Sequence, residues 1–350
     1  MLELEKIFTP KAMAARWDES ANLRIPYLGE GLFPARKQAG LDLKWFKGSK
    51  GIPVSLMPSA FDAQATYRDR IGVGKTETEM PFFREGFKIK EKDRQEILRA
   101  QDTGDPYAQS VINRVFDDTN QLLDGAMIVP ERMRMQLLFS DSGNLGISIQ
   151  ANGVDYTYNY DPLGEWKASN YFYLSGQRVW TDTTHADPFD DVETIKNAIS
   201  EATGTTLQHM IMNRNTFNKL IKIAALTERF QSTTGRAIAR LTPRELASVF
   251  EDTVEMNVLV YDKQFKDESG VARKFVPDGY VALIPDGELG NTWYGTTPEE
   301  ADGTNVEIVN TGVALATVKI DHPVNTNIIA SEIVLPSYER MDEVALLKVV

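Results

Sequence analysis

The chain has 350 residues, of which 42% are hydrophobic and 25% charged, a composition that suits one large globular domain or two medium ones. It has no cysteine, which excludes disulfides, thiolate metal sites and a cysteine nucleophile. A net charge of -12 argues against a general nucleic-acid binder, because such a protein needs a basic surface to neutralise phosphates. No stretch is apolar enough to cross a bilayer and no signal-peptide pattern opens the chain, so we expect a cytoplasmic product.

Residues 1–40 predict a short helix followed by an irregular segment. Thr9 can cap the helix and Pro10 suits its first position, so the helix should run to about Glu19. Prolines and glycines between Pro26 and Pro34 break any further regular structure, yet the segment is rich in apolar side chains. This pattern is typical of an arm that lies over another surface.

Residues 41–90 predict a long two-stranded ribbon. Its first strand should run from about Val54 to Ile71, with glycines at the tip and a return strand that ends near Ile89. A lone ribbon dense in Arg, Lys and Glu has too little apolar surface to be stable by itself, so it needs a neighbour to lie on. An ordinary surface hairpin of a two-layer domain is the alternative.

The stretch from Asp105 to Phe139 predicts one unusually long helix. Asp105 can cap its first turn, Pro106 suits its first helical position, and about 34 residues at ~1.5 Å each give a rod of roughly 50 Å. Pro130 removes one backbone hydrogen bond, so we expect a bend there. The expected buried stripe has one polar member, Thr119, and otherwise consists of Ala108, Ile112, Val115, Leu122, Ala126, Val129, Met133 and Leu137.

Residues 147–160 predict a hairpin with one apolar face. A two-residue turn at Asn152-Gly153 would place Ile149 opposite Tyr156 and Ile147 opposite Tyr158. The long helix is the expected packing partner of that face. The dense aromatic residues here favour packing over base stacking, because acidic rather than basic side chains lie between them.

From Asp187 onward, helices and short strands alternate and predict a second α+β unit. Asp190 and Glu193 resemble a capping box at the start of a helix that ends at Gly204, with Val192, Ile195, Ile199 and Ala202 on its buried face. Further elements are expected at 207–212 (strand), 215–230 (helix), from Thr242 (helix), 258–261 (strand) and 280–284 (strand). An aperiodic loop over 285–302 closes the unit, and strands over 328–335 and 344–350 should return to the first sheet.

No sequence motif carries catalytic or metal chemistry. Gly74-Lys75-Thr76 resembles the end of a phosphate-binding loop, but that motif needs glycine where the chain has Asp69, whose charge would repel phosphate. The three histidines, at 185, 209 and 322, lack a metal-ligand spacing. Adjacent acidic residues diverge on a helix and cannot hold one proton between them. We therefore expect no enzyme activity, no cofactor and no metal.

Several segments, taken in their order along the chain, together resemble one known family. They are Thr76 to Pro81 with Gly86 to Lys90, Asp105 to Ala108, Arg134 to Leu138, Met210 to Met212 with Phe217, Leu220 and Ile221, and Asn257 to Tyr261 with Gly270, Phe275 to Asp278 and Leu289 to Thr292. Over nearly its whole length the chain is similar to phage major capsid proteins with the Hong Kong 97 fold, and in particular to the lambda major head protein (protein E) family. Pro130 departs from that family's spine helix.

The resemblance implies an α+β fold with five parts. These are an N-terminal arm over 1–40, an extended hairpin called the E-loop over 41–90, a peripheral domain over 91–186 with a spine helix at 105–139 on an antiparallel sheet, an axial α+β domain over 187–320, and return strands over 321–350.

The resemblance also implies a structural major capsid protein that self-assembles into pentamers and hexamers of an icosahedral head. The head would enclose double-stranded DNA without sequence-specific binding, and its acidic wall would repel the DNA. A separate scaffolding protein and a portal are the implied partners, with a decoration protein as an optional one, and no membrane is involved. Assembly would take place in the host bacterial cytoplasm.

Three inter-subunit surfaces follow from the resemblance. The E-loop surface comprises Tyr67, Arg68, Arg70, Lys75, Phe82, Phe83 and Arg84; the arm surface comprises Tyr27, Leu28, Leu32 and Phe33; the loop at the capsomer axis comprises Glu288, Trp293, Tyr294, Glu299 and Glu300. Some relatives cross-link a ribbon lysine to a neighbour's asparagine, and Lys75 is the candidate here, although no catalytic carboxylate is evident.

Two other functions remain open at this level. The same fold could form an encapsulin-like nanocompartment shell around a cargo enzyme, and the imperfect phosphate loop leaves a nucleotide-binding enzyme as the remote alternative. Particles filled with DNA would indicate a phage head, whereas particles filled with protein would indicate a nanocompartment shell. A nucleotide-dependent shift in melting temperature would support a nucleotide-binding enzyme.

Overall fold

The computed structural model describes residues 8–21, 25–47, 74–103, 106–151, 153–238, 240–322 and 324–350. They form two compact units, and each unit combines three separate stretches of the chain. Unit 1 takes its described residues from 1–44, 77–133 and 290–337, and unit 2 from 45–76, 134–289 and 338–350. This division differs from the predicted domains, because residues 290–320 belong to unit 1 rather than to the α+β unit that precedes them.

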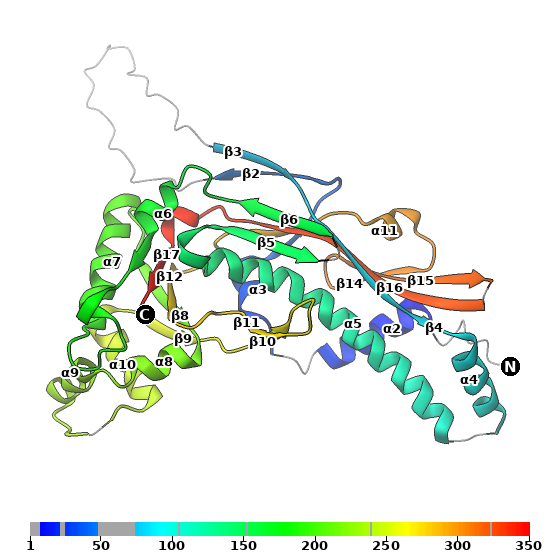
Figure 1. Ribbon diagram of the computed structural model, residues 1–350, viewed down its shortest axis with the longest axis horizontal. Coiled ribbons are helices and arrows are strands. Elements are labelled where there is room, and N and C mark those ends of the chain that lie inside the picture. Colours follow the sequence, from blue (N-terminus) through cyan, green and yellow to red (C-terminus); the bar gives the residue numbers. More distant parts are fainter. Residues whose placement is uncertain are drawn as a thin grey trace, which may run out of the picture. The chain divides into compact units, whose positions relative to one another are not determined.

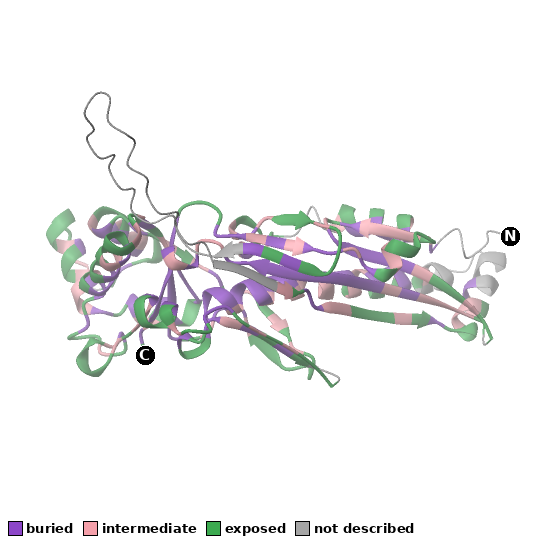
Figure 2. Cartoon of the chain, turned by 90° about the horizontal axis from the view of Figure 1, so that it is seen from above, coloured by how far each residue is buried: buried purple, intermediate pink, exposed green. Residues whose placement is uncertain are grey.

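Unit 1 is built on a six-stranded sheet around the long strand β16 (Val324–Ser337). β16 pairs antiparallel with β15 (Val313–Asp321) on one side, and with β4 (Phe82–Ile89) and β13 (Asn291–Tyr294) on the other. The strand β14 (Val306–Val309) pairs with β15, and β1 (Ala35–Lys37) runs parallel to β13. The whole of the β16 C-terminal half is buried, as Figure 2 shows by its colour.

Unit 1 has five helices among its described residues (Figure 1). They are α2 (Pro10–Ala21), α3 (Leu28–Leu32), α4 (Glu91–Thr103), the long α5 (Pro106–Leu138) and α11 (Pro298–Asp302). Apolar side chains of α2, α4 and α5 form a core with strands of this sheet. The predicted start of α2 is confirmed, since Thr9 Oγ1 accepts a hydrogen bond from the backbone N–H of Ala12 at 3.2 Å. Trp17 of α2 donates from Nε1 to Asp124 of α5 at 3.0 Å and so ties the two helices together.

The predicted long helix is confirmed as the single helix α5, which continues through Pro130. Its buried line differs slightly from the predicted stripe, because Leu123 and Met127 are buried whereas Leu122, Ala126 and Val129 are half-buried. The buried Thr119 hydroxyl donates to the Val115 carbonyl at 2.8 Å, so a polar residue lies in the core with its donor satisfied.

Unit 2 contains a five-stranded sheet in the order β7-β17-β12-β8-β9. These strands are β7 (Tyr171–Tyr173), β17 (Ala345–Lys348), β12 (Tyr280–Pro285), β8 (Leu207–Met212) and β9 (Asn257–Val260). The helices α6 (Glu165–Asn170), α7 (Pro188–Thr203), α8 (Arg214–Leu220), α9 (Ala224–Thr234) and α10 (Pro243–Val254) belong to the same unit, with three short 3₁₀ turns at Asp141–Gly143, Gly176–Arg178 and Met341–Glu343. Apolar side chains of α7 to α10 and the central strands form its core.

The predicted hairpin of unit 2 is confirmed in its register. β5 (Gly146–Ala151) pairs with β6 (Val154–Asn159), and Ile149 lies opposite Tyr156 and Ile147 opposite Tyr158. Its contact with α5 is also confirmed, because the Gln136 side-chain amide donates to the Ser148 carbonyl at 3.0 Å and accepts from the Ser148 N–H at 3.1 Å. Two further strand pairs are β10 (Gln264–Lys266) with β11 (Ala272–Lys274), and β2 (Asp42–Lys47) with β3 (Gly74–Glu79).

Several local predictions were wrong. Asp187 rather than Asp190 caps α7, by accepting from the N–H groups of Phe189 and Asp190, and Ala202 is exposed. The predicted helix over 215–230 is two helices, α8 and α9, because the Ala224 N–H donates to the Thr183 carbonyl at 2.8 Å instead of continuing the helical pattern.

Two long-range predictions were also wrong. The last strand, β17, pairs with β12 and β7 in unit 2 and does not return to the sheet of unit 1. The expected aperiodic loop over 285–302 instead contains β13 and α11, because short apolar and capping signals there were too brief to show a period.

Candidate assembly surfaces

The predicted E-loop residues divide into two groups. Tyr67, Arg68 and Arg70 lie outside the described residues. Lys75 is in β3, a strand paired with β2. The residues 82–84 open β4, whose partners on β16 are residues 331–333, so this part of the predicted ribbon lies on its own chain. A neighbour is therefore not needed to satisfy that edge of β4.

Arg84 is held in place on unit 1 by two contacts. Its guanidinium forms an ion pair with Glu299 at 2.6 Å and lies over the Phe82 ring at 4.7 Å from the ring centre. Glu299 also accepts from the Ser331 hydroxyl at 2.7 Å. These contacts fix α11 to the sheet, which gives the predicted surface residues Arg84 and Glu299 a role inside the subunit.

The predicted arm residues also lie on their own unit. Phe33 is completely buried and its carbonyl accepts from the Thr292 hydroxyl at 2.9 Å. The N–H of Gly29 in α3 donates to the buried carboxylate of Glu131 at 3.2 Å. The side chains of Tyr27, Leu28 and Leu32 are half-buried. Phe33 therefore offers no surface to a neighbouring subunit.

The five residues assigned to a loop at the capsomer axis do not form one loop. Trp293 and Tyr294 belong to β13, inside the sheet of unit 1, and Tyr294 is only 3% exposed. Glu300 in α11 pairs with Lys37 at 2.6 Å. Glu288 is exposed in unit 2, where its carbonyl accepts from Arg340. The grouping into one loop was wrong because β13 was not recognised as a strand, and the placement of these residues at a capsomer axis stays a prediction.

Exposed apolar side chains lie at positions that the sequence prediction omitted. Ile25 in unit 1 is 79% exposed, and in unit 2 Leu163 is 79% and Tyr173 70% exposed. Apolar side chains left in water are a common mark of contact surfaces when they cluster, and scattered ones are ordinary. Only accessibility distinguishes them from their buried neighbours, so no sequence signal could have identified them.

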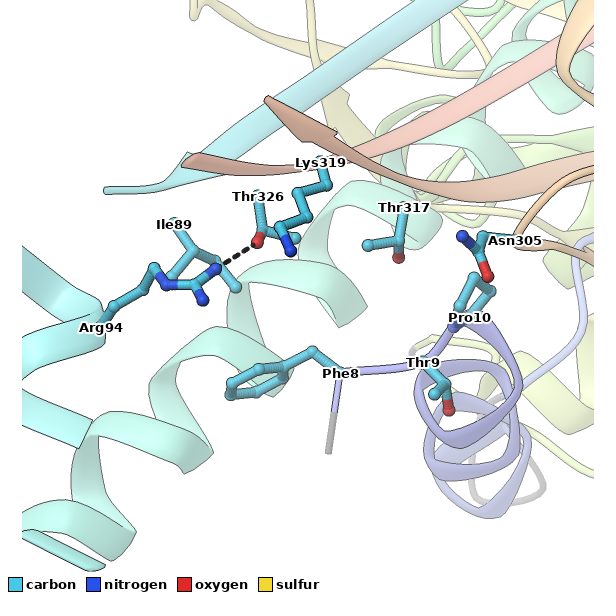
Figure 3. A pocket seen from close by; sticks show the side chains of 9 residues that line it. All are labelled: Phe8, Thr9, Pro10, Ile89, Arg94, Asn305, Thr317, Lys319 and Thr326. Atoms are coloured by element: carbon cyan, nitrogen blue, oxygen red, sulfur yellow. Dashed lines mark hydrogen bonds between the residues drawn. The ribbon is translucent and has the colours of Figure 1, made fainter. Parts of the chain in front are cut away.

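A cavity of about 180 Å³ lies in unit 1 beside the start of α2 (Figure 3). Arg94 points into it and donates to the Thr326 hydroxyl at 3.1 Å. Its lining consists of Phe8, Thr9, Pro10, Ile89, Arg94, Asn305, Thr317, Lys319 and Thr326. Among the described residues that line it there is no carboxylate or imidazole, and its charged side chains are those of Arg94 and Lys319.

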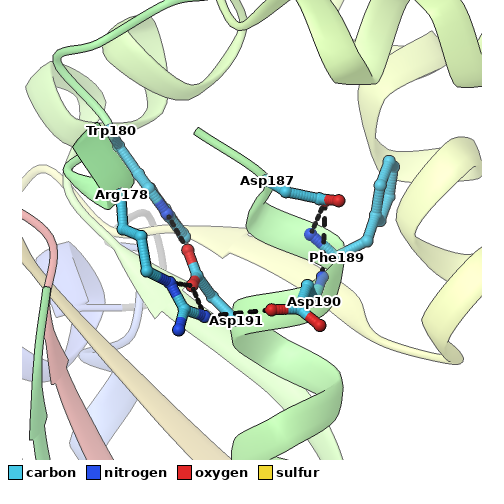
Figure 4. A network of polar contacts seen from close by, with 6 residues as sticks. All are labelled: Arg178, Trp180, Asp187, Phe189, Asp190 and Asp191. Carbon is cyan, nitrogen blue, oxygen red and sulfur yellow. Dashed lines mark hydrogen bonds and ion pairs between the residues drawn. The ribbon is translucent and has the colours of Figure 1, made fainter. Parts of the chain in front are cut away.

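A network of polar contacts in unit 2 connects the segment 178–180 to the start of α7 (Figure 4). Arg178 donates from Nε and Nη2 to Asp191 Oδ1 at 3.1 and 2.6 Å and from Nη2 to Asp190 at 3.0 Å. Trp180 Nε1 donates to Asp191 Oδ2 at 3.0 Å. Both carboxylate oxygens of the buried Asp191 are thereby satisfied.

The ionisation of this pair fits a structural role. Burial raises the pKa of Asp191 despite the opposing hydrogen bonds from Trp180 and Arg178, and the hydrogen bond to Asp191 raises the pKa of Arg178. Asp191 is 2% exposed, so no substrate can reach it. Among the described residues no group of three His, Asp or Glu is placed to bind a metal ion, and no helix is long and apolar enough to span a membrane.

Comparison with known proteins identifies the family. The family model described as phage major capsid protein E matches residues 9–349. No curated protein sequence gives a significant match. In fold, the chain is similar to a phage-related protein from Bordetella bronchiseptica RB50, with 16% identity and a TM-score of 0.59 over 97% of this chain and 96% of that one.

Two capsid structures are also similar. The putative capsid protein of a prophage of E. coli CFT073 has 11% identity and a TM-score of 0.53, over 79% of this chain and 80% of that one. The capsid subunit of cyanophage A-1(L) has 13% identity and a TM-score of 0.50, over 91% of each chain. At these identities the likeness shows the mixed helix-and-sheet fold. Because the family model matches nearly the whole chain, this protein belongs to the phage major capsid protein E family and is a structural capsid protein.

Proposed function

We propose that copies of this chain adopt the Hong Kong 97 fold and assemble into pentamers and hexamers, which close an icosahedral phage head around double-stranded DNA. The match of the capsid family model to residues 9–349 carries the proposal. In the terms of that fold, unit 1 with α5 would be the peripheral domain and unit 2 the axial domain. Residues 48–73, which lie outside the described residues, would belong to the E-loop.

The charge of the chain supports a container rather than a nucleic-acid binder. A net charge of -12 on every copy makes the shell wall acidic, so packed DNA would slide along it without sequence-specific contacts. We further propose a separate scaffolding protein and a portal as partners, with assembly in the host bacterial cytoplasm. A decoration protein would be an optional outer partner.

Size-exclusion chromatography and electron microscopy of the purified chain, with and without a scaffolding protein from the same phage, test the proposal. We expect pentamers, hexamers or closed shells that contain no cofactor. A chain that remains monomeric at all concentrations, with and without scaffold, would overturn it. Particles isolated from infected cells should contain DNA, and particles filled with a cargo protein would instead identify a nanocompartment shell.

A further inference from the structure

Charge is strongly segregated along the helical part of unit 2. Between residues 214 and 244 the chain has seven Lys or Arg and one Glu, and between 245 and 262 it has five Asp or Glu and no Lys or Arg. The change of sign takes place at the start of α10 (Pro243–Val254). The basic stretch is a local feature, because the net charge of the whole chain is negative.

The two ends of α10 therefore carry opposite charge. We call Arg236, Arg240 and Arg244 the basic end, and Glu251, Asp252 and Glu255 the acidic end; all six are exposed. Arg236 lies 3.9 Å from Glu245. Within the described part of the chain, the other five side chains have no oppositely charged group within ion-pair distance.

The two ends cannot neutralise each other within one subunit. Twelve helical residues span about 18 Å, which exceeds the ~8 Å over which charges interact in physiological salt. Arg244 and the acidic end lie on α10 or at its C-cap, so the helix fixes their separation, whereas Arg236 and Arg240 lie in the segment that leads into the helix. α10 contacts α7 on one side and α9 on the other and cannot bend the ends together.

These charges also oppose the dipole of their own helix. A helix favours negative charge at its N-terminus and positive charge at its C-terminus. Arg244 is at the second position of α10, whereas Glu251, Asp252 and Glu255 end the helix with no basic residue in the last turn. Lys196 of α7 donates from Nζ to the Val254 carbonyl and so supplies a positive charge at the C-terminus of α10. On α10 itself, however, Glu245 in the capping box is the one charge placed as the dipole prefers, so helix stability does not explain the other charges.

We propose that the basic end of α10 in one subunit docks against the acidic end of α10 in the next copy of the same chain. The inference rests on the proposed function, in which subunits repeat around a ring. A ring needs a head-to-tail interface made of two different, complementary surfaces, and one helix with opposite charges at its ends supplies both.

A second copy fits these charges better than nucleic acid does. Phosphates would be attracted to the basic end, but the acidic end of the same helix and the net charge of -12 would repel them. A second copy of this chain carries both a basic and an acidic end, with the same distance between them.

Charge reversal in the full-length chain tests the contact. The basic-end variant is Arg240→Glu with Arg244→Glu, the acidic-end variant is Glu251→Lys with Glu255→Lys, and the swapped variant combines all four. The control variant, Lys167→Glu with Lys266→Glu, reverses two exposed cations of unit 2 outside α10. Melting curves and circular dichroism of the unassembled subunits establish that each variant is folded.

We expect each single-end variant to lower the yield of closed shells at least about tenfold, because the like-charge contact recurs at every interface of a ring. The swapped variant should recover closed shells, and the control should assemble as the wild type does. In an equimolar mixture, the two single-end variants can alternate around a ring of six subunits but not around a ring of five. The mixture should therefore yield hexamer-based tubes or sheets rather than closed shells.

Three results would overturn the contact. Folded single-end variants that assemble normally would exclude it, as would a folded swapped variant that does not recover. A basic-end variant that forms normal shells but loses bound nucleic acid would assign the arginines to DNA. Failure of the wild type to assemble would instead refute the proposed function, so the two failures are distinguishable.

Discussion

Two glycines that look alike in the sequence have opposite expected effects on stability when replaced. A Cβ on Gly290 would lie 2.0 Å from the Ser337 carbonyl oxygen, so the backbones of β13 and β16 would have to separate. A Cβ on Gly125, inside α5, would meet nothing within 4 Å. The first glycine is required by close backbone approach, whereas the second only weakens a helix.

We therefore expect Gly290→Ala to lower the free energy of unfolding by about 1–3 kcal/mol through overpacking. Gly125→Ala, the matched control, should raise it by about 0.5–1 kcal/mol because alanine restricts the unfolded chain and favours the helix. Urea unfolding of the unassembled subunit measures both. Equal effects of the two substitutions would contradict the close approach at Gly290.

Asp278 should make the stability of unit 2 sensitive to acid. Burial raises its pKa, but hydrogen bonds from Lys274, Asn215 and Asn213 outweigh burial and leave the pKa below the ordinary value. A carboxylate with a lowered folded pKa stabilises the fold above its unfolded pKa, near 4, and this contribution is lost as the pH falls through the folded value.

We expect Asp278→Asn to cost about 1 kcal/mol at pH 7, a figure reduced for screening because the side chain is 46% exposed. The variant should also lose less stability than the wild type when the pH is lowered from 5 to 3. Urea midpoints across that range provide the comparison. Parallel curves for the two proteins would show that this carboxylate does not contribute to acid sensitivity.

At the level of elements, the acidic residues at the C-terminus of α10 should lower the stability of that helix. Glu251→Lys removes an unfavourable charge from the helix C-terminus, and we expect it to raise the free energy of unfolding by about 0.3–1 kcal/mol. Glu228→Lys, in the middle of α9, is the matched control and should change stability by less than about 0.5 kcal/mol. Thermal unfolding of unassembled subunits reports both, and a destabilised Glu251→Lys would mean that the acidic end is stabilised by contacts within the subunit.

Elements with local signals could be predicted from the sequence. The capping box at Thr242 and Glu245 has both of its hydrogen bonds, and the turn at Gly153 set the hairpin register correctly. The helix break before Ala224 was missed because its cause is a hydrogen bond to the distant Thr183 carbonyl. Likewise, the apolar run over 345–347 indicated a buried strand but contained nothing that specified which sheet it joins.

The candidate surfaces were less predictable than the elements for the same reason. For apolar residues such as Phe33 and Tyr294, the sequence does not show whether the side chain is buried inside its own subunit or contacts a neighbouring subunit. Phe33 is buried, and its carbonyl accepts a hydrogen bond from the hydroxyl of Thr292, which follows it by 259 positions. The exposed Ile25, eight residues earlier, has the same hydrophobic character.

For the whole molecule, we expect deletion of Asp62 to Thr78 to separate folding from assembly. The deletion removes residues 62–73, which lie outside the described part of the chain, and nearly all of β3, the partner of β2. β4, which follows the deleted segment, is held by β16. The deleted chain should therefore remain folded and soluble but form no closed shells if the segment lies across a neighbouring subunit. Circular dichroism checks folding and electron microscopy counts particles; a normal particle yield would exclude that role.

The large sheet of each unit has an interior strand that comes late in the chain. β16, over 324–337, holds three neighbours in unit 1, and β17, over 345–348, lies between β7 and β12 in unit 2. Neither unit can complete its sheet until these residues have left the ribosome. A subunit that stops before residue 324 would therefore lack an interior strand in both large sheets, and we expect such a truncated chain to be excluded from growing shells.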